Sequence, residues 1–179
     1  MTKTALILLP LLASCSALDI DEARIGASSF LITATDEGTV GGQAVRSTAD
    51  GTGEGATLEL TNHVSKDTSA GLLFGYSTGS IVSVDIEQID VAAVGRHYLI
   101  GDTLRPYLEG RAGWMRFGAS DEFMESDGLD AFKVGASLGL ELHATSSVVI
   151  FLQGNYDAAF APDFTTQGAS VTIGGALRF

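Results

Sequence analysis

The feature that most constrains this chain is an alternation of apolar and polar residues with a period of two, which recurs from about residue 20 to the last residue. Successive side chains of a β-strand point to opposite faces of a sheet, so this period predicts strands with one apolar and one polar face. After Asp19, no window has a sustained helical period. The chain is therefore predicted to be all-β.

The alternation divides the chain into eight predicted strands. They occupy approximately residues 23–34, 56–61, 70–76, 89–99, 104–117, 130–144, 148–160 and 167–179. A phase conflict near Glu87 and Gln88 interrupts the fourth strand, and we interpret it as a β-bulge. An even number of antiparallel strands places both termini on the same side of the sheet.

The predicted connections alternate in length. Those at residues 63–68, 99–103 and 145–147 are short, those at 78–84 and 161–166 are intermediate, and those at 35–53 and 118–128 are long and acidic. Short turns on one side and longer loops on the other are typical of outer-membrane barrels. In such a barrel the short turns, and with them both termini, are expected on the periplasmic side.

The two faces of the predicted strands favour a closed barrel that spans a membrane. A bilayer cannot satisfy the hydrogen bonds of a sheet edge, so spanning strands must close on themselves. The apolar face would then meet lipid, and the other face would carry ionic groups into the lumen, where opposite charges should pair. The predicted lumen charges are Glu59, Asp90, Arg96, Arg105, Glu109, Arg111, Lys133, Glu141, Asp157 and Arg178.

Four aromatic residues support the same arrangement. Tyr76, Trp114, Phe132 and Tyr156 all lie on the apolar face, near the ends of their strands that lead into the longer loops. Aromatic residues at matching height are typical of the girdle that a membrane barrel places at the lipid–water interface. These four residues are therefore predicted to be interfacial.

The N-terminus predicts export. Residues 1–17 have a lysine followed by a short apolar run, which is typical of a signal peptide and too short to span a membrane. The sequence Leu12-Ala13-Ser14-Cys15 matches a lipoprotein cleavage site and predicts lipidation of Cys15, the only cysteine. The alternative is ordinary cleavage near Ala17. In either case residues 18–179 form the predicted barrel domain.

Three segments resemble the small outer-membrane β-barrel family, which includes opacity-like and OmpA/OmpX-type barrels. They are RPYLEGRAGWMRF (residues 105–117), VGASLGLEL (134–142) and the C-terminal VTIGGALRF. The resemblance implies an eight-stranded antiparallel up-and-down transmembrane β-barrel in the outer membrane. It also implies that the barrel-assembly machinery recognises the ending at Phe179, and that the protein is a monomer among outer-membrane lipid and lipopolysaccharide.

Little in the sequence predicts catalysis or cofactor binding. The net charge of -12 argues against a nucleic-acid partner. Ser137, Glu141 and His143 share one strand face, but alternate residues on a strand lie about 6–7 Å apart, which is too far for a direct relay. The acidic stretch from Asp121 to Asp130 does not fit an EF-hand, and the glycine-rich segments lack a P-loop lysine. We therefore predict no catalytic, cofactor or metal site.

The preferred function is that of a structural or surface-interaction protein, in which the barrel is the anchor and the acidic loops contact an unknown surface ligand. Because eight strands enclose little more than their own side chains, no open pore is expected. A lipid-anchored soluble barrel that binds a partner protein remains an alternative, since typical members of the family lack a lipoprotein signal. A membrane-embedded hydrolase is a further alternative.

Overall fold

The computed structural model describes residues 20–40, 43–82, 84–101, 103–121, 124–125 and 128–179. The predicted signal peptide and Cys15 lie outside these residues. No helix among the described residues is long and apolar enough to cross a membrane. The strands are β1 (Glu22–Val40), β2 (Gln43–Ser65), β3 (Thr68–Ile81), β4 (Val84–Tyr98), β5 (Leu104–Asp121), β6 (Met124–Glu125), β7 (Leu129–His143), β8 (Val148–Ala161) and β9 (Phe164–Arg178).

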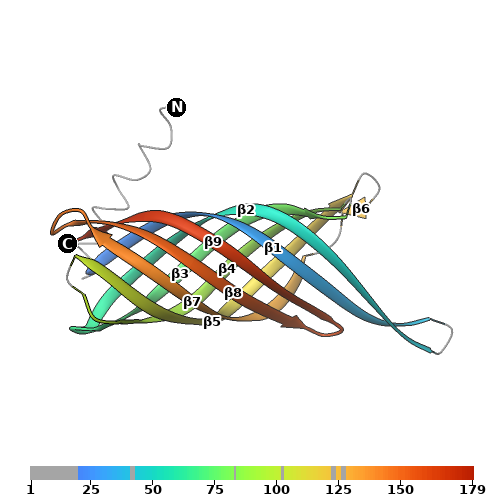
Figure 1. Cartoon of the computed structure of the whole chain (residues 1–179). Coiled ribbons are helices and arrows are strands. Elements are labelled where there is room, and N and C mark those ends of the chain that lie inside the picture. The colour runs from blue at the N-terminus through green and yellow to red at the C-terminus, as the bar shows by residue number, and fades with distance from the viewer. Residues whose placement is uncertain (1–19, 41–42, 83, 102, 122–123, 126–127) are drawn as a thin grey trace.

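Eight long strands form a closed antiparallel barrel in the described part of the chain (Figure 1). Each strand pairs with its sequence neighbours, β1 pairs with β9, and the pairing of β4 with β5 completes the ring. The two-residue β6 pairs only with the end of β5. The predicted eight-stranded up-and-down barrel is therefore confirmed, because neither β1 nor β9 is left with an open edge along the wall.

The strand register sets the width of the barrel. Following the paired residues once around the barrel from Glu22 leads back to β1 at Ile32, so the two ends of the circuit are staggered by ten residues. The circuit passes through Thr61, Gly71, Val94, Arg111, Gly135, Asp157 and Gly168. Strand number and stagger together fix the tilt, which for these values is about 40°. An eight-stranded barrel with this tilt has an interior that side chains can fill.

The two ends of the barrel differ (Figure 1). One end, called the short-turn end, holds both chain ends of the barrel and the tight connections β2–β3, β4–β5 and β7–β8. The other, called the hairpin end, holds the connections β1–β2, β3–β4 and β8–β9 and the segment between β5 and β7. The halves of the barrel next to these two ends are called the short-turn half and the hairpin half.

The long loop predicted at residues 35–53 is mostly strand, so this prediction was wrong. β1 and β2 remain paired as far as Val40 and Gln43. β1 leaves β9 after Asp36, and β2 meets β3 only from Gly51, so residues 37–40 and 43–50 form a two-stranded ribbon beyond the barrel. Its small and polar residues lack the apolar alternation that marks the other strands, which explains why the sequence did not predict it.

Two other predictions need correction. β4 pairs without interruption through Glu87 and Gln88, so the predicted bulge is absent there. A register shift occurs instead between His63 and Ser65, at the end of β2 that leads into the turn to β3. The predicted loop at residues 118–128 is also shorter, because β5 continues to Asp121. The phase conflict in the sequence near Glu87 and Gln88 therefore reflects a change of side-chain polarity along β4, which is a regular strand.

Candidate functional site: the barrel interior and the hairpin end

The lumen of the short-turn half holds a network of paired charges. At its centre, Arg96 is almost completely buried, and its guanidinium contacts Glu59 at 2.5 Å, Glu109, and Glu22 at 3.7 Å. The guanidinium also lies 4.8 Å from the centre of the Tyr107 ring. Because three carboxylates surround one arginine, further cations are needed for neutrality.

Two other arginines supply positive charge, and a fourth carboxylate, Glu141, pairs with both of them. Arg24 lies 2.5 Å from Glu22 and also contacts Glu141, while Arg178 lies 2.5 Å from Glu22 and 3.1 Å from Glu141. Every carboxylate therefore faces at least one guanidinium, which offsets the cost of burying charge. We call this network the ionic cluster; its members are Glu22, Arg24, Glu59, Arg96, Glu109, Glu141 and Arg178.

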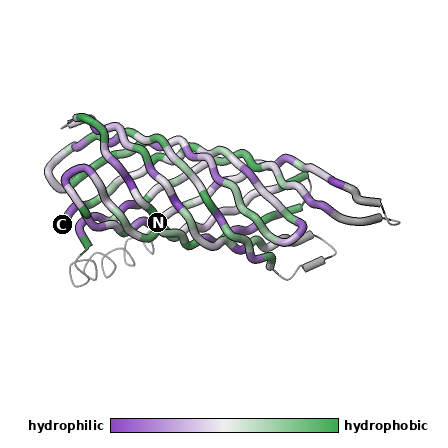
Figure 2. Tube along the Cα trace, turned by 90° about the horizontal axis from the view of Figure 1, so that it is seen from below, coloured by the Kyte–Doolittle hydropathy of each residue, from purple (hydrophilic) through white to green (hydrophobic). Residues whose placement is uncertain are grey.

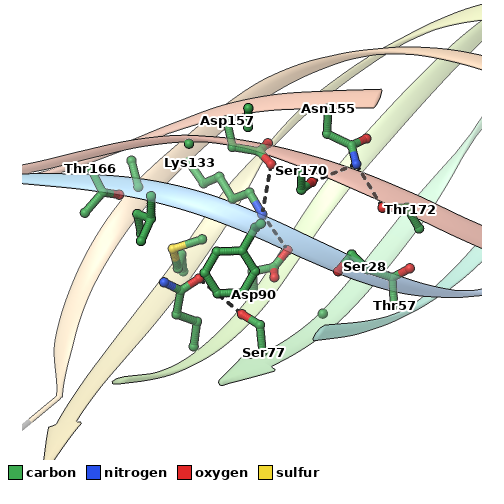
Figure 3. Close-up of a pocket in the computed structure, with 18 of the residues that line it drawn as sticks. Ser28, Thr57, Ser77, Asp90, Lys133, Asn155, Asp157, Thr166, Ser170 and Thr172 are labelled. Carbon is green, nitrogen blue, oxygen red and sulfur yellow. Dashed lines mark hydrogen bonds and ion pairs between the residues drawn. The ribbon is translucent and has the colours of Figure 1, made fainter. Parts of the chain in front are cut away.

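The middle of the lumen holds a small cavity lined by both charged and apolar residues (Figure 3). Its volume is about 90 Å³, which leaves room for several water molecules. Lys133 Nζ lies 3.1 Å from Asp90 and 4.0 Å from Asp157, and Arg111 Nε donates to Asp157 at 2.8 Å. These charges point into the cavity from β4, β5, β7 and β8 and are paired with one another, while apolar residues such as Leu73 and Met115 also line the wall.

Amide side chains connect the cavity to the ionic cluster. The Tyr107 hydroxyl donates to Gln153 at 2.8 Å, and Gln153 donates to Glu109 at 3.1 Å and to Asn155 at 2.5 Å. Asn155 then donates at 2.9 Å to both Ser170 and Thr172 on β9. Polar contacts therefore run without a break from the short-turn half to the middle of the lumen.

The lumen of the hairpin half is apolar instead. Its buried residues and those packed against them form what we call the apolar core, which consists of Phe30, Ile32, Ile81, Ile86, Met115, Phe117, Leu129, Ala131, Ala159, Ala161 and Phe164. The rings of Phe117 and Phe164 meet edge to face at 5.7 Å. Paired charges, a small cavity and an apolar core thus occupy three successive levels of the interior.

All ten residues predicted as lumen charges lie on the inner face. Nine of them join the ionic cluster or the cavity wall, whereas Arg105 lies at the rim, 3.8 Å from Asp67 and over the Tyr98 ring. Glu22 and Arg24 were not among the predicted lumen charges, because the hydropathy pattern defines the start of the first strand poorly. The two residues are spaced two positions apart, which places both charges on one strand face, and this spacing was the signal in the sequence that could have identified them. With these two, the described part of the interior carries six acids and six bases.

The outer wall of the short-turn half is apolar. Tyr76, Trp114, Phe132 and Tyr156 project outward with 40–57% of their surface exposed, beside aliphatic residues of every long strand. The hydropathy colouring shows apolar and polar residues interspersed along the barrel wall (Figure 2). Phe179 follows β9 at the short-turn end and is also exposed. An apolar wall of this extent is unusual for a surface in contact with water.

The outside of the hairpin end is acidic. Among the described residues, its exposed acids outnumber its exposed bases, Arg46 and Arg116; the acids are Asp36, Glu37, Asp50, Glu54, Asp85, Glu87, Asp130 and Asp163. The charges described in the lumen balance, so they contribute nothing to the net charge of -12. On the ribbon, Arg46 lies 3.8 Å from Glu37, and both are exposed.

The residues considered for hydrolysis do not form a catalytic set. Glu141 and His143 do meet, with Oε2 and Nε2 3.3 Å apart, so the expectation that they were too far apart for direct contact was wrong. Ser137 lies six residues from His143, about 20 Å along the strand, and its buried hydroxyl has no hydrogen-bond partner among the described residues. Within the same residues, no group of three or more acids, histidines or cysteines could hold a metal ion.

No protein-family model and no curated protein matches this sequence. Solved structures do match. Neisserial surface protein A aligns with a TM-score of 0.62 at 14% identity, over 88% of this chain and 97% of that chain. Ail, the attachment invasion locus protein of Yersinia pestis, aligns with a TM-score of 0.50 at 15% identity, over 89% and 99%.

A third match is the outer-membrane protease OmpT of Escherichia coli, with a TM-score of 0.52 at 8% identity, over 90% of this chain and 97% of that chain. A barrel of this kind can therefore carry an enzyme, and the fold does not decide whether this one does. At these identities the likeness concerns the fold. The chain has the fold of the small eight-stranded outer-membrane β-barrels.

Proposed function

We propose that this protein is an outer-membrane barrel that anchors its hairpin end at the cell surface, where it has a structural or surface-interaction role. The observation that carries the proposal is the apolar outer wall around a lumen of paired charges. A soluble barrel has apolar residues inside and polar residues outside. The short-turn half has the opposite arrangement, which weighs against the lipid-anchored soluble barrel.

The difference between the two ends supports the orientation. Outer-membrane barrels place short turns in the periplasm and longer segments outside the cell. Both termini would then be periplasmic, and a lipid on Cys15 would enter the inner leaflet of the outer membrane. The ribbon and the acidic wall would face outward among lipopolysaccharide. Free strand edges such as those of the ribbon can bind extended segments of other proteins.

We also propose that the barrel conducts no steady ion current. The ionic cluster fills the lumen at the short-turn end, and the apolar core fills it at the hairpin end. Ions would have to disrupt both levels to pass. Planar-bilayer recordings of the purified protein should detect no steady conductance, and a stable open level would contradict this part of the proposal.

Heat-dependent mobility tests the proposed function. The full chain and its Cys15→Ser variant should both migrate differently on an SDS gel before and after boiling, and both should resist carbonate extraction from isolated outer membranes. Absence of a mobility shift, together with release of the Cys15→Ser variant by carbonate, would instead support a lipid-anchored soluble barrel.

A further inference from the structure

The polarity of the barrel wall inverts along its axis. In β4, Ile89 points outward and Asp90 inward, whereas three residues earlier Glu87 points outward and Ile86 inward. The strand alternates regularly across this change and its pairing is unbroken. The inversion is therefore a change in residue type at constant side-chain direction.

The same inversion occurs in the neighbouring strands. In β5, the outward Trp114 is followed by the outward Arg116, while the inward residues change from Arg111 to Phe117. In β7, moving toward the hairpin end, outward Phe132 gives way to Asp130 and inward Lys133 gives way to Ala131. Because Arg116 pairs with Asp130 and Trp114 with Phe132, the inversion lies at the same register in both strands.

The outward aromatic residues mark this level. The Tyr76 hydroxyl donates to Glu87 at 3.4 Å, and the Tyr156 hydroxyl donates to Gln167 at 2.9 Å. Both rings thus lie against the apolar wall while their hydroxyls reach polar residues. This is the environment that tyrosine prefers where hydrocarbon meets water.

The length of the apolar wall matches one bilayer. A tilted spanning strand needs about 9–11 residues. The outward apolar positions run from Leu104 to Trp114 in β5 and from Phe132 to Leu142 in β7, which is eleven residues in each case. β5 continues for seven residues beyond Trp114, to Asp121, which adds about 15 Å along the barrel axis.

We propose that the bilayer covers only the short-turn half, and that the hairpin half stands in water as a rigid extension with the apolar core in its lumen. The inference rests on the proposed function and adds the position of the lipid boundary, at the level of Tyr76, Trp114 and Phe132. On β4, β5 and β7 the wall above that level has the arrangement of a soluble barrel, with charged residues outside and apolar side chains inside. The extension holds the ribbon above the lipid surface.

Site-specific quenching tests the boundary. In the full chain with Cys15→Ser, single cysteines at outward positions would carry an environment-sensitive fluorophore: Asp85→Cys and Val91→Cys in β4, and Asp130→Cys and Leu138→Cys in β7. Each variant would be folded into phosphatidylcholine vesicles with brominated acyl chains, after a heat-dependent mobility shift had established that it forms the barrel.

We expect quenching at positions 91 and 138 to exceed that at positions 85 and 130 by at least threefold. Strong quenching at all four positions would overturn the inference and leave the membrane barrel intact. Quenching at none of the four positions, in variants that show the mobility shift, would overturn the proposed function as well, because no outward position of the barrel would then contact lipid.

Discussion

The two halves of this barrel have opposite distributions of polar and apolar side chains, although one continuous sheet forms both. The short-turn half has apolar side chains outside and ion pairs inside, whereas the hairpin half has acids outside and the apolar core inside. The backbone hydrogen bonds are the same in both, since the register continues across the boundary. Backbone hydrogen bonding therefore determines the barrel, while side-chain polarity determines the solvent that each half tolerates.

The two interiors should also respond differently to mutation. A buried ion pair contributes little compared with an apolar replacement of both partners, but loss of one partner leaves a buried charge without compensation. An apolar core loses transfer free energy and gains a cavity when a side chain is truncated. Single substitutions in each half therefore measure which of these two terms dominates there.

The largest effect is expected in the ionic cluster. Arg96→Met removes the cation that contacts Glu59 and Glu109, and the free energy of unfolding should fall by about 3–5 kcal/mol. Urea unfolding in vesicles would measure it. Arg46→Met is the matched control, because its contact with Glu37 is exposed and should contribute less than about 1 kcal/mol. Equal losses for the two variants would contradict the role assigned to the cluster.

The next effect is expected in the apolar core. Phe117→Ala removes a buried ring that packs on Phe164, and the cost should be about 3 kcal/mol. Amide hydrogen exchange should accelerate mainly in the hairpin half. Phe160→Ala, at an outward and half-exposed position, serves as the comparison and should leave exchange in that half unchanged. Uniform acceleration along every strand would mean that the halves do not unfold separately.

A smaller difference in stability is expected between substitutions on the outer walls of the two halves. Leu138→Arg places a charge near the middle of the apolar wall, and we expect a loss of about 2 kcal/mol in vesicles. Glu87→Arg lies on the same outer surface but above the inversion, and its effect should be within about 0.5 kcal/mol. If both substitutions were tolerated equally, the short-turn half would not face lipid.

The smallest effect should distinguish the inside of the short-turn half from its outside. A Cβ at Gly139 would lie 2.1 Å from the Tyr107 ring, so Gly139→Ala should cost about 1–2 kcal/mol. A Cβ at Gly110 would meet nothing within 4 Å, and Gly110→Ala should be neutral or slightly stabilising. Thermal unfolding monitored by the heat-dependent mobility shift would rank the two variants.

Most of the barrel was predictable from the sequence, because the period of two follows directly from strand geometry. The inward direction of Lys133, Glu141 and Asp157 follows from that period alone. The contacts that these side chains make do not follow from the period, because the register and tilt of the barrel decide which residues of different strands meet. Lys133 on β7 meets Asp90 on β4, with β5 between them in the sheet, a pairing that no local spacing encodes.

Two features could not be predicted for physical reasons. Alternation indicates which residues share a face, but the solvent on that face can change along a strand, so the polarity inversion near Glu87 resembled a bulge. The ribbon was missed because its glycines and small polar residues carry no apolar signal, although backbone pairing extends through it. In both cases the backbone continued where the hydropathy pattern changed.

Trp114 tests the central claim most directly, because it is the only tryptophan and needs no mutation. It lies on the outer wall at the polarity inversion. In vesicles, lipids brominated near the headgroups should quench its fluorescence more strongly than lipids brominated near the chain ends, and its emission should be blue-shifted relative to the unfolded chain. Equal emission with and without vesicles, and no quenching at either depth, would contradict a barrel whose lipid boundary lies at this level.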